Sequence, residues 1–160
     1  MIIQRYKLKY DINKLNEELN ELWPLDRYQL TTYATPTGSY YQPITEGSMP
    51  THIKEVVELS IGKKILNHAM LWDFRASKEL IKHKDTYGTF DDPPEEIAVV
   101  SLENTFTLNI WDDSNSKILK VKQSVTYKPG DIITFNNIDD LHSGEVLNRD
   151  IPRRTLNCYV

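Results

Sequence analysis

Residues 127–143 read YKPGDIITFNNIDDLHS, which places a turn, an apolar run, a polar loop and a histidine in that order. The Pro-Gly-Asp sequence at 129–131 is typical of a tight turn. The run from Ile132 to Phe135 predicts a buried strand, and the polar residues after it predict a short loop that ends at His142. This stretch therefore predicts a fold built from short strands, with His142 presented at a strand end.

Short strands with turn signals between them continue through residues 66–160. The candidates are residues 66–74, 79–83, 97–102, 105–111, 118–122, 132–136, 144–147 and 153–160. Eight short strands at this spacing predict a jelly-roll-like, cupin-like double sheet. A doubly wound α/β fold would need long helices between the strands, and the sequence has none. The predicted fold class is mainly β with flanking helices.

Residues 1–65 have a different pattern of apolar and polar residues, which predicts helices and strands that support that core. Residues 2–8 alternate as a half-buried strand does, and a helix opens at Asp11 and ends before Pro24. Residues 28–47 predict a strand and loop, and residues 50–60 a second helix that Gly62 terminates. We expect one domain, with 1–65 as N-terminal helices and strands and 66–160 as the core.

Composition narrows the function classes. The chain has 160 residues, a net charge of -4 and 39% hydrophobic residues, so one domain can bury a core without a structural metal. Interspersed charges without a basic face argue against a nucleic-acid partner. No apolar run reaches membrane-spanning length, and the N-terminus lacks a signal-peptide pattern. The single Cys158 favours a reducing, cytoplasmic location.

Three separated pieces of the chain suggest a metal site. His83 and Asp85 are two apart in a strand, so their side chains share one face and can converge on one ion. His142 arrives on the loop described above, an arrangement that recurs in double-sheet metal barrels. Two imidazoles and one carboxylate can occupy one face of a divalent iron and leave the other open for ligands. Without a metal, Asp85 would open a turn and His142 would bond a neighbouring aspartate.

The terminal strand adds a candidate anion site. Arg153 and Thr155 share a face by the period-two rule, while Arg154 faces the other way. A buried guanidinium needs an anionic partner and can grip a carboxylate with two hydrogen bonds. The third piece therefore suits the remote carboxylate of a 2-oxo acid, and a salt bridge to a structural Asp or Glu is the alternative.

These pieces, in this order, resemble the Fe(II)/2-oxoglutarate-dependent dioxygenase superfamily, particularly its compact prolyl and aspartyl/asparaginyl hydroxylases. The resemblance covers residues 66–160 and rests on His83-x-Asp85, His142 and Arg153-x-Thr155. It implies a double-stranded β-helix core, with iron held by His83, Asp85 and His142. It also implies O2 and 2-oxoglutarate as co-substrates, with Arg153 and Thr155 on the distal carboxylate, and hydroxylation of an amino-acid or peptidyl substrate.

Two other classes of protein share part of this pattern. A cupin-like module could bind a metal or ligand without oxygenation, but cupins usually bind their metal through more histidines and do not require an anion site such as Arg153. A purely structural jelly roll would make the three pieces coincidental. Arg75, Tyr87, Tyr40 and Tyr41 are the candidates for substrate contact. For Trp72, Phe74 and Trp111, whose strands alternate with polar residues, we expect core packing, and His52 and His68 are expected at the surface.

Overall fold

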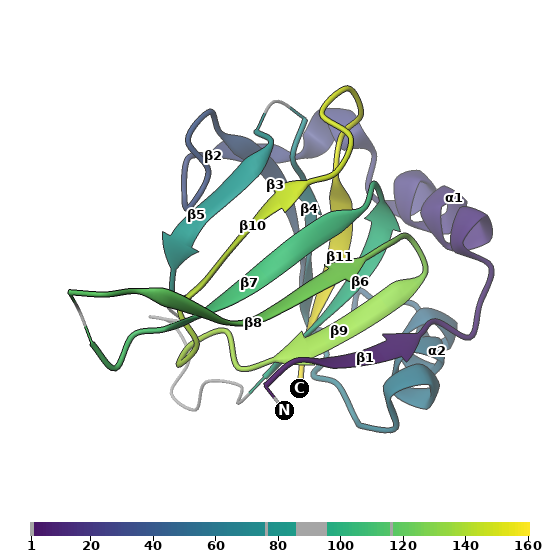
Figure 1. Cartoon of the computed structure of the whole chain (residues 1–160). Helices are drawn as coiled ribbons and strands as arrows, with labels where there is room; N and C mark the ends of the chain where they lie inside the picture. Colours follow the sequence, from purple (N-terminus) through teal and green to yellow (C-terminus); the bar gives the residue numbers. More distant parts are fainter. Residues whose placement is uncertain (1, 76, 86–95, 116) are drawn as a thin grey trace.

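Two facing antiparallel sheets make up the body of the protein (Figure 1). The computed structural model describes residues 2–75, 77–85, 96–115 and 117–160. The large sheet has the order β1 (Gln4–Lys7), β9 (Asp131–Phe135), β6 (Ile97–Glu103), β11 (Arg154–Tyr159), β4 (Ala69–Asp73), β3 (Ser39–Ile44) and β2 (Gln29–Thr31). The small sheet has the order β5 (Glu79–His83), β10 (His142–Val146), β7 (Phe106–Asp112) and β8 (Lys120–Tyr127). The predicted double-sheet, double-stranded β-helix architecture is confirmed.

Both predicted helices are present and cover the outer face of the large sheet (Figure 1). Helix α1 (Ile12–Leu22) begins where the Asp11 side chain accepts a hydrogen bond from the Lys14 amide, and a short 3₁₀ helix (Leu25–Arg27) follows Pro24. Helix α2 (Thr51–Ile61) ends at Gly62, whose φ of 70° places it in the left-handed region that glycine adopts without strain. Local sequence signals therefore set the helix ends.

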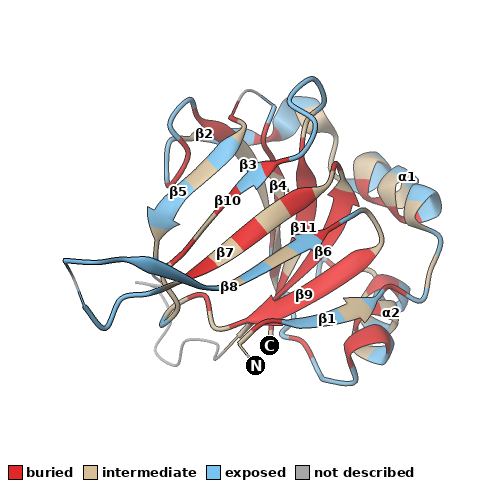
Figure 2. Ribbon diagram, in the orientation of Figure 1, coloured by how far each residue is buried: buried red, intermediate tan, exposed pale blue. Residues whose placement is uncertain are grey.

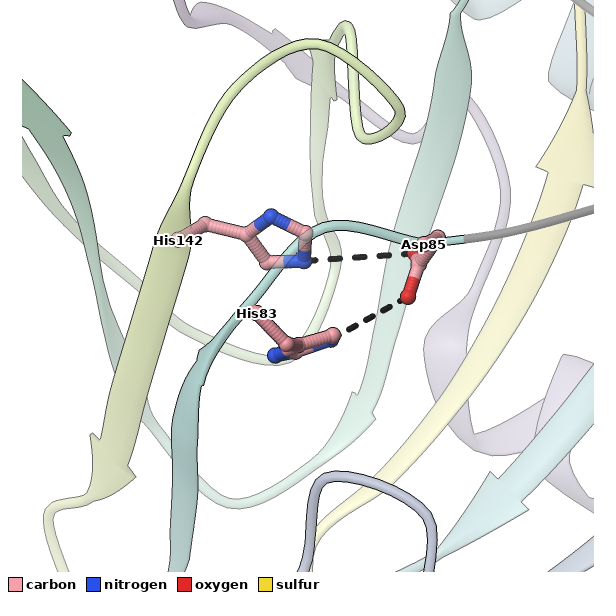
Figure 3. A group of neighbouring side chains, drawn as sticks. All are labelled: His83, Asp85 and His142. Carbon is pink, nitrogen blue, oxygen red and sulfur yellow. Dashed lines mark ion pairs between the residues drawn. The ribbon is translucent and has the colours of Figure 1, made fainter. Parts of the chain in front are cut away.

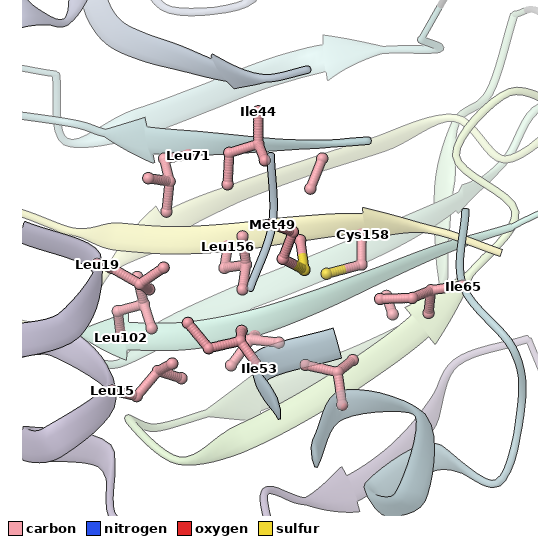
Figure 4. Close-up of a cluster of buried hydrophobic side chains, with 14 of the residues drawn as sticks. Leu15, Leu19, Ile44, Met49, Ile53, Ile65, Leu71, Leu102, Leu156 and Cys158 are labelled. Carbon is pink, nitrogen blue, oxygen red and sulfur yellow. The ribbon is translucent and has the colours of Figure 1, made fainter. Parts of the chain in front are cut away.

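A first hydrophobic core joins these helices to the large sheet (Figure 4). Leu15 and Leu19 of α1 and Ile53 of α2 pack against alternate residues of the central strands, among them Leu156 and Cys158 of β11. The free thiol of Cys158 is fully buried in this layer, and burial raises its pKa to about 12. This core uses the face of β11 that carries Leu156 and Cys158, which leaves the face of Thr155 and Asn157 for the site.

A second core lies between the two sheets. Its residues share the inward-facing positions of β6, β7, β9 and β10, and strands β9 and β11 are buried along most of their length (Figure 2). They include Val99, Phe106, Leu108, Ile133 and Phe135. These apolar side chains line one end of the space between the sheets, and the predicted site residues occupy the same space.

Several strand boundaries differ from the sequence prediction, and two of these differences bear on the site. Strand β8 begins at Lys120 and continues to Tyr127, whereas only residues 118–122 were predicted, because exposed polar residues alternate along it without an apolar run. His142 is the first residue of β10 and not part of the preceding loop. Strands β1, β2 and β3 of the N-terminal segment join the large sheet. None of the helices in the described ranges is long and apolar enough to cross a membrane.

Gly144 in β10 makes room for the Phe106 side chain of β7, the neighbouring strand in the same sheet. A Cβ built there would lie 2.3 Å from the Phe106 ring and 2.6 Å from the Thr107 carbonyl oxygen. We expect Gly144→Ala to lower the free energy of unfolding by about 1–3 kcal/mol, because ring and backbone must both shift. Urea unfolding measures this change. The exposed neighbour is the control: Glu145→Ala should stay within about 0.5 kcal/mol of wild type, and equal effects would contradict the steric argument.

Candidate metal and co-substrate site

The small sheet brings the three predicted metal ligands together. Strands β5 and β10 are antiparallel neighbours, and His83 at the end of one pairs directly with His142 at the start of the other. Asp85 follows His83 by two residues, just beyond the strand end, and turns back toward both rings (Figure 3). One ligand atom from each residue lies within 4.8 Å of the other two. We call His83, Asp85 and His142 the metal triad.

The Asp85 carboxylate faces both imidazoles. Its Oδ1 lies 3.1 Å from Nε2 of His83 and its Oδ2 lies 3.9 Å from Nε2 of His142, as the dashed lines in Figure 3 mark. The two imidazole rings are close to each other, with centroids 4.2 Å apart. Two nitrogens and a carboxylate oxygen pointing at one small volume are the donor set of a divalent transition metal.

Backbone hydrogen bonds select the nitrogen that each histidine presents. Nδ1 of His83 lies 2.7 Å from the Ile81 carbonyl oxygen, and Nδ1 of His142 lies 2.8 Å from the Asp140 carbonyl oxygen. Each ring therefore donates its Nδ1 proton to the backbone, so a neutral ring presents an Nε2 lone pair to Asp85. Lone pairs then face a carboxylate with no proton between them, and a cation satisfies all three groups at once.

Electrostatics favours the protonation states that bind a metal. Burial lowers the pKa of His142, with the nearby His83 acting in the same direction, so the ring is neutral at pH 7. Burial by itself would raise the pKa of Asp85, but the adjacent imidazoles of His83 and His142 and the hydrogen bond from the Asn137 amide outweigh it. The pKa of Asp85 therefore falls below its usual value, and the carboxylate is ionised.

Two neighbouring side chains hold Asp85 in place. The Asn137 amide donates to Oδ2 of Asp85 at 2.6 Å, and the Asp85 backbone N–H donates to the Asn137 carbonyl at 2.8 Å. The Tyr33 hydroxyl lies 3.4 Å from Oδ1, and its ring meets the His83 ring edge to face at 5.6 Å. Such partners orient metal ligands, and their loss commonly weakens metal binding. Neither Asn137 nor Tyr33 was predicted as a site residue from the sequence.

Arg153 is buried in the same space without a counter-charge. Its side chain is 6% exposed and makes no ion pair with any residue in the described ranges. The guanidinium lies 3.6 Å from the Phe106 ring centroid and 4.8 Å from that of Phe74, and it donates to the Tyr127 hydroxyl at 2.5 Å. No described residue accepts a hydrogen bond from its Nε. A buried charge without a counter-ion destabilises the protein, so Arg153 is positioned to bind an anionic ligand.

A single cavity contains the metal triad, Arg153 and Thr155. Its walls are otherwise mostly aromatic and aliphatic, and include Trp72, Phe74, Leu80, Ile97, Val99, Phe106, Leu108, Tyr127 and Phe135. Phe74 is 3% exposed and packs on the Phe106 ring, so the prediction of core packing is confirmed for it. The prediction is wrong for Trp72, which is half-buried at the cavity. It is also wrong for Trp111, which is half-buried on the outer face of β7, where its indole N–H donates to the Ser143 hydroxyl at 2.8 Å.

The predicted alternation of the terminal strand is observed. Arg153, Thr155 and Asn157 line the cavity, while Arg154 lies on the opposite face, 3.6 Å from Glu103 and bonded to Asn20. Asn157 accepts a hydrogen bond from the Thr155 hydroxyl at 2.9 Å. The period-two rule could therefore have added Asn157 to the site.

Of the four predicted substrate contacts, the three that the structure describes do not line the cavity. Arg75 and Tyr40 are stacked on each other, with the guanidinium 4.1 Å from the ring centroid, and Arg75 also pairs with Asp73 at 2.9 Å. Neither residue lines the cavity, because Tyr40 faces the helix-covered side of the large sheet. Tyr41 lies beside the Trp72 ring at 5.7 Å, at the edge of the cavity wall. Tyr87 lies outside the described residues.

Tyr127 is the main site residue that the sequence analysis missed. It is the last residue of β8, just before the Pro-Gly-Asp turn at 129–131, and its phenol is fully buried against Arg153. Burial raises the pKa of Tyr127 despite the adjacent guanidinium, so the hydroxyl stays protonated. A tyrosine before a turn has no distinctive sequence signal, whereas a phenol facing an arginine from the opposite sheet is visible only in three dimensions.

Comparison with known proteins gives a fold match but no sequence match. No protein-family model and no curated protein sequence matches the chain. Among solved structures, OsALKBH1 is 12% identical with a TM-score of 0.71, covering 99% of this chain and 97% of its own. A prolyl-4-hydroxylase from Pseudomonas putida is 13% identical with a TM-score of 0.63, covering 99% and 91%.

A third similar structure is the non-haem alpha-ketoglutarate-dependent carbocyclase SnoK from nogalamycin biosynthesis. It is 9% identical with a TM-score of 0.72, covering 98% of this chain and 78% of its own. The chain has the fold of the Fe(II)/2-oxoglutarate oxygenases. The resemblance inferred from the sequence is therefore confirmed at the level of fold. The similar proteins include a hydroxylase and a carbocyclase, so the shared fold does not specify the substrate or the reaction.

Proposed function

We propose that the protein is an Fe(II)/2-oxoglutarate-dependent oxygenase that hydroxylates an amino-acid or peptidyl substrate. The observation that carries this proposal is the placement of the metal triad and the unpaired Arg153 in one cavity. A metal-binding cupin-like module would account for the triad but would leave a buried guanidinium without an anionic partner. A dicarboxylic acid that reaches from a metal to Arg153 accounts for both.

The donor set of the cavity fits these groups. Nε2 of His83, Nε2 of His142 and a carboxylate oxygen of Asp85 would hold Fe(II), with open positions opposite them. Arg153 would bind the distal carboxylate of 2-oxoglutarate, with Tyr127 fixing the guanidinium and Thr155 lining the same wall. When bound, iron, 2-oxoglutarate and O2 together supply oxidation of a C–H bond, with succinate and CO2 released.

The chain's own residues orient the reactants and exclude water. The Phe74 and Phe106 rings flank Arg153, so a carboxylate bound there is shielded from solvent and held strongly. Asn137 and the two backbone carbonyls fix the ligand side chains before a metal arrives. Preorganisation of this kind avoids rearrangement of the ligands during the reaction.

Anaerobic titration tests the proposal directly. We expect Fe(II) and 2-oxoglutarate together, but neither alone, to produce a weak visible charge-transfer band in the purified protein. On admission of O2, slow succinate formation should follow and should rise when a true substrate is present. If the protein binds iron but 2-oxoglutarate changes neither the spectrum nor thermal stability, the oxygenase proposal is wrong and a metal-binding module remains.

A further inference from the structure

The charged residues of the cavity restrict the substrate. We infer that the part of the substrate that enters is uncharged and bears an amide, and that its flat or apolar face packs on Trp72. A residue within a peptide meets this description, whereas a free amino acid with its carboxylate does not. The inference rests on the proposed function and deepens it by naming the substrate class.

The first observation is the charge balance of the loaded cavity. Apart from the metal triad and Arg153, every described residue that lines the cavity is uncharged. The positive charges of Fe(II) and Arg153 are matched by Asp85 and the two carboxylates of 2-oxoglutarate. A further anionic group would therefore enter a largely apolar space with no cation left to pair with it, which is costly.

Among the described residues that line the cavity, Arg153 is the only lysine or arginine. The lysines beside the metal ligands are engaged elsewhere: Lys84 pairs with Asp113 at 2.8 Å, and the Lys82 ammonium lies 4.1 Å from the Trp111 ring centroid. Neither lysine lines the cavity. The residues outside the described ranges, namely 1, 76, 86–95 and 116, include no lysine, arginine or histidine in the sequence. A substrate carboxylate or phosphate at the reacting end therefore has no basic partner.

The second observation is the exposed aromatic wall beside Arg153. Trp72 of β4 lies opposite Thr155 of β11. Phe74, two residues further along the same face, contacts the Trp72 ring and packs on the Arg153 guanidinium. It is half-buried, and its outer side meets the Tyr41 ring at 5.7 Å. A half-buried indole that lines a cavity offers a large flat apolar surface to a ligand.

The indole of Trp72 also offers a hydrogen bond. In the described part of the chain, no residue accepts from its N–H group. An N–H donor beside an apolar surface suits a neutral carbonyl oxygen, such as that of a peptide amide. A carboxylate would also accept this bond, but a single neutral donor does not offset the loss of water from a full charge.

Matched pairs of small compounds test the charge requirement. A set of N-acetylated amino-acid amides is compared with the corresponding N-acetylated acids and free amino acids, and stimulated succinate release is measured for each. We expect every compound that stimulates to be an amide, with its acid at least about tenfold weaker. Calorimetric titration of the best amide into protein loaded with Mn(II) and 2-oxoglutarate gives the same order without turnover. The proposal is overturned if an acid or free amino acid outperforms its amide, or if no amide stimulates.

Tryptophan variants test the role of Trp72. We expect Trp72→Ala to weaken binding of the best amide about tenfold while 2-oxoglutarate still binds. Trp72→Phe keeps a flat ring without the N–H, so its affinity for the amide should lie between those of Trp72→Ala and wild type. Trp111→Phe, on the outer face of the small sheet, is the matched control and should behave as wild type. Unchanged amide binding in Trp72→Ala would overturn the inference, whereas failure of wild type to bind 2-oxoglutarate would instead refute the proposed function.

Discussion

Replacing His142 with alanine should lower the affinity for Fe(II) at least about hundredfold, since loss of a ligand's supporting partner alone commonly costs ten- to hundredfold. His142 supplies one of the three donors, and its buried ring has no neighbour positioned to replace it among the described residues. The charge-transfer band seen with 2-oxoglutarate should disappear, and succinate formation with it. Iron affinity is measured by anaerobic titration with a competing chelator.

A surface histidine provides the control for this variant. His52 pairs with Glu18 at 2.5 Å on the helix side of the molecule, away from the cavity. His52→Ala should therefore retain wild-type iron affinity and the full band. Circular dichroism and thermal unfolding establish that the His142 variant is folded. If that folded variant binds iron as tightly as His52→Ala does, the metal triad is not the iron site.

The metal triad was predictable from sequence because strand periodicity carries the necessary geometry. Side chains two apart on a strand share a face, so His83-x-Asp85 and Arg153-x-Thr155 each specify a direction as well as a composition. The turn, apolar run and loop before His142 predicted this histidine just ahead of a strand at 144–147, and it is the first residue of β10. Local rules therefore predicted most strands and the five candidate side chains that share one cavity.

The cavity wall was not predictable in the same way. An alternating strand such as that containing Trp72 shows which residues face inward, but not whether a packed core or an open cavity lies there. Tyr127, Asn137 and Tyr33 reach the site from distant parts of the chain, so their roles depend on how the two sheets pack. Arg75 and Tyr40 were candidates for substrate contact, but they stack on each other on the opposite face of the sheet.

Replacing Arg153 with methionine should raise the 2-oxoglutarate concentration needed for half-saturation about hundredfold, the usual cost of removing one partner from a buried charge pair. Iron affinity should not change, because Arg153 contacts none of the metal ligands. The metal-free, ligand-free variant should be as stable as wild type or more so. A buried guanidinium without an anion destabilises the empty protein, and methionine fills similar space between Phe74 and Phe106 without a charge.

Thermal unfolding separates this prediction from a general loss of structure. At a 2-oxoglutarate concentration of about 100 times Kd, wild type with Mn(II) should gain about 2.7 kcal/mol, or about 5–10 °C in Tm, whereas Arg153→Met should gain almost nothing. Arg154→Met is the matched control one residue away. It removes the partner of Glu103 and Asn20 on the other face, so it should lower the stability of the empty protein but keep the full 2-oxoglutarate shift. Arg153 is not the co-substrate anchor if the two variants lose the shift equally, because Arg154 lies outside the cavity.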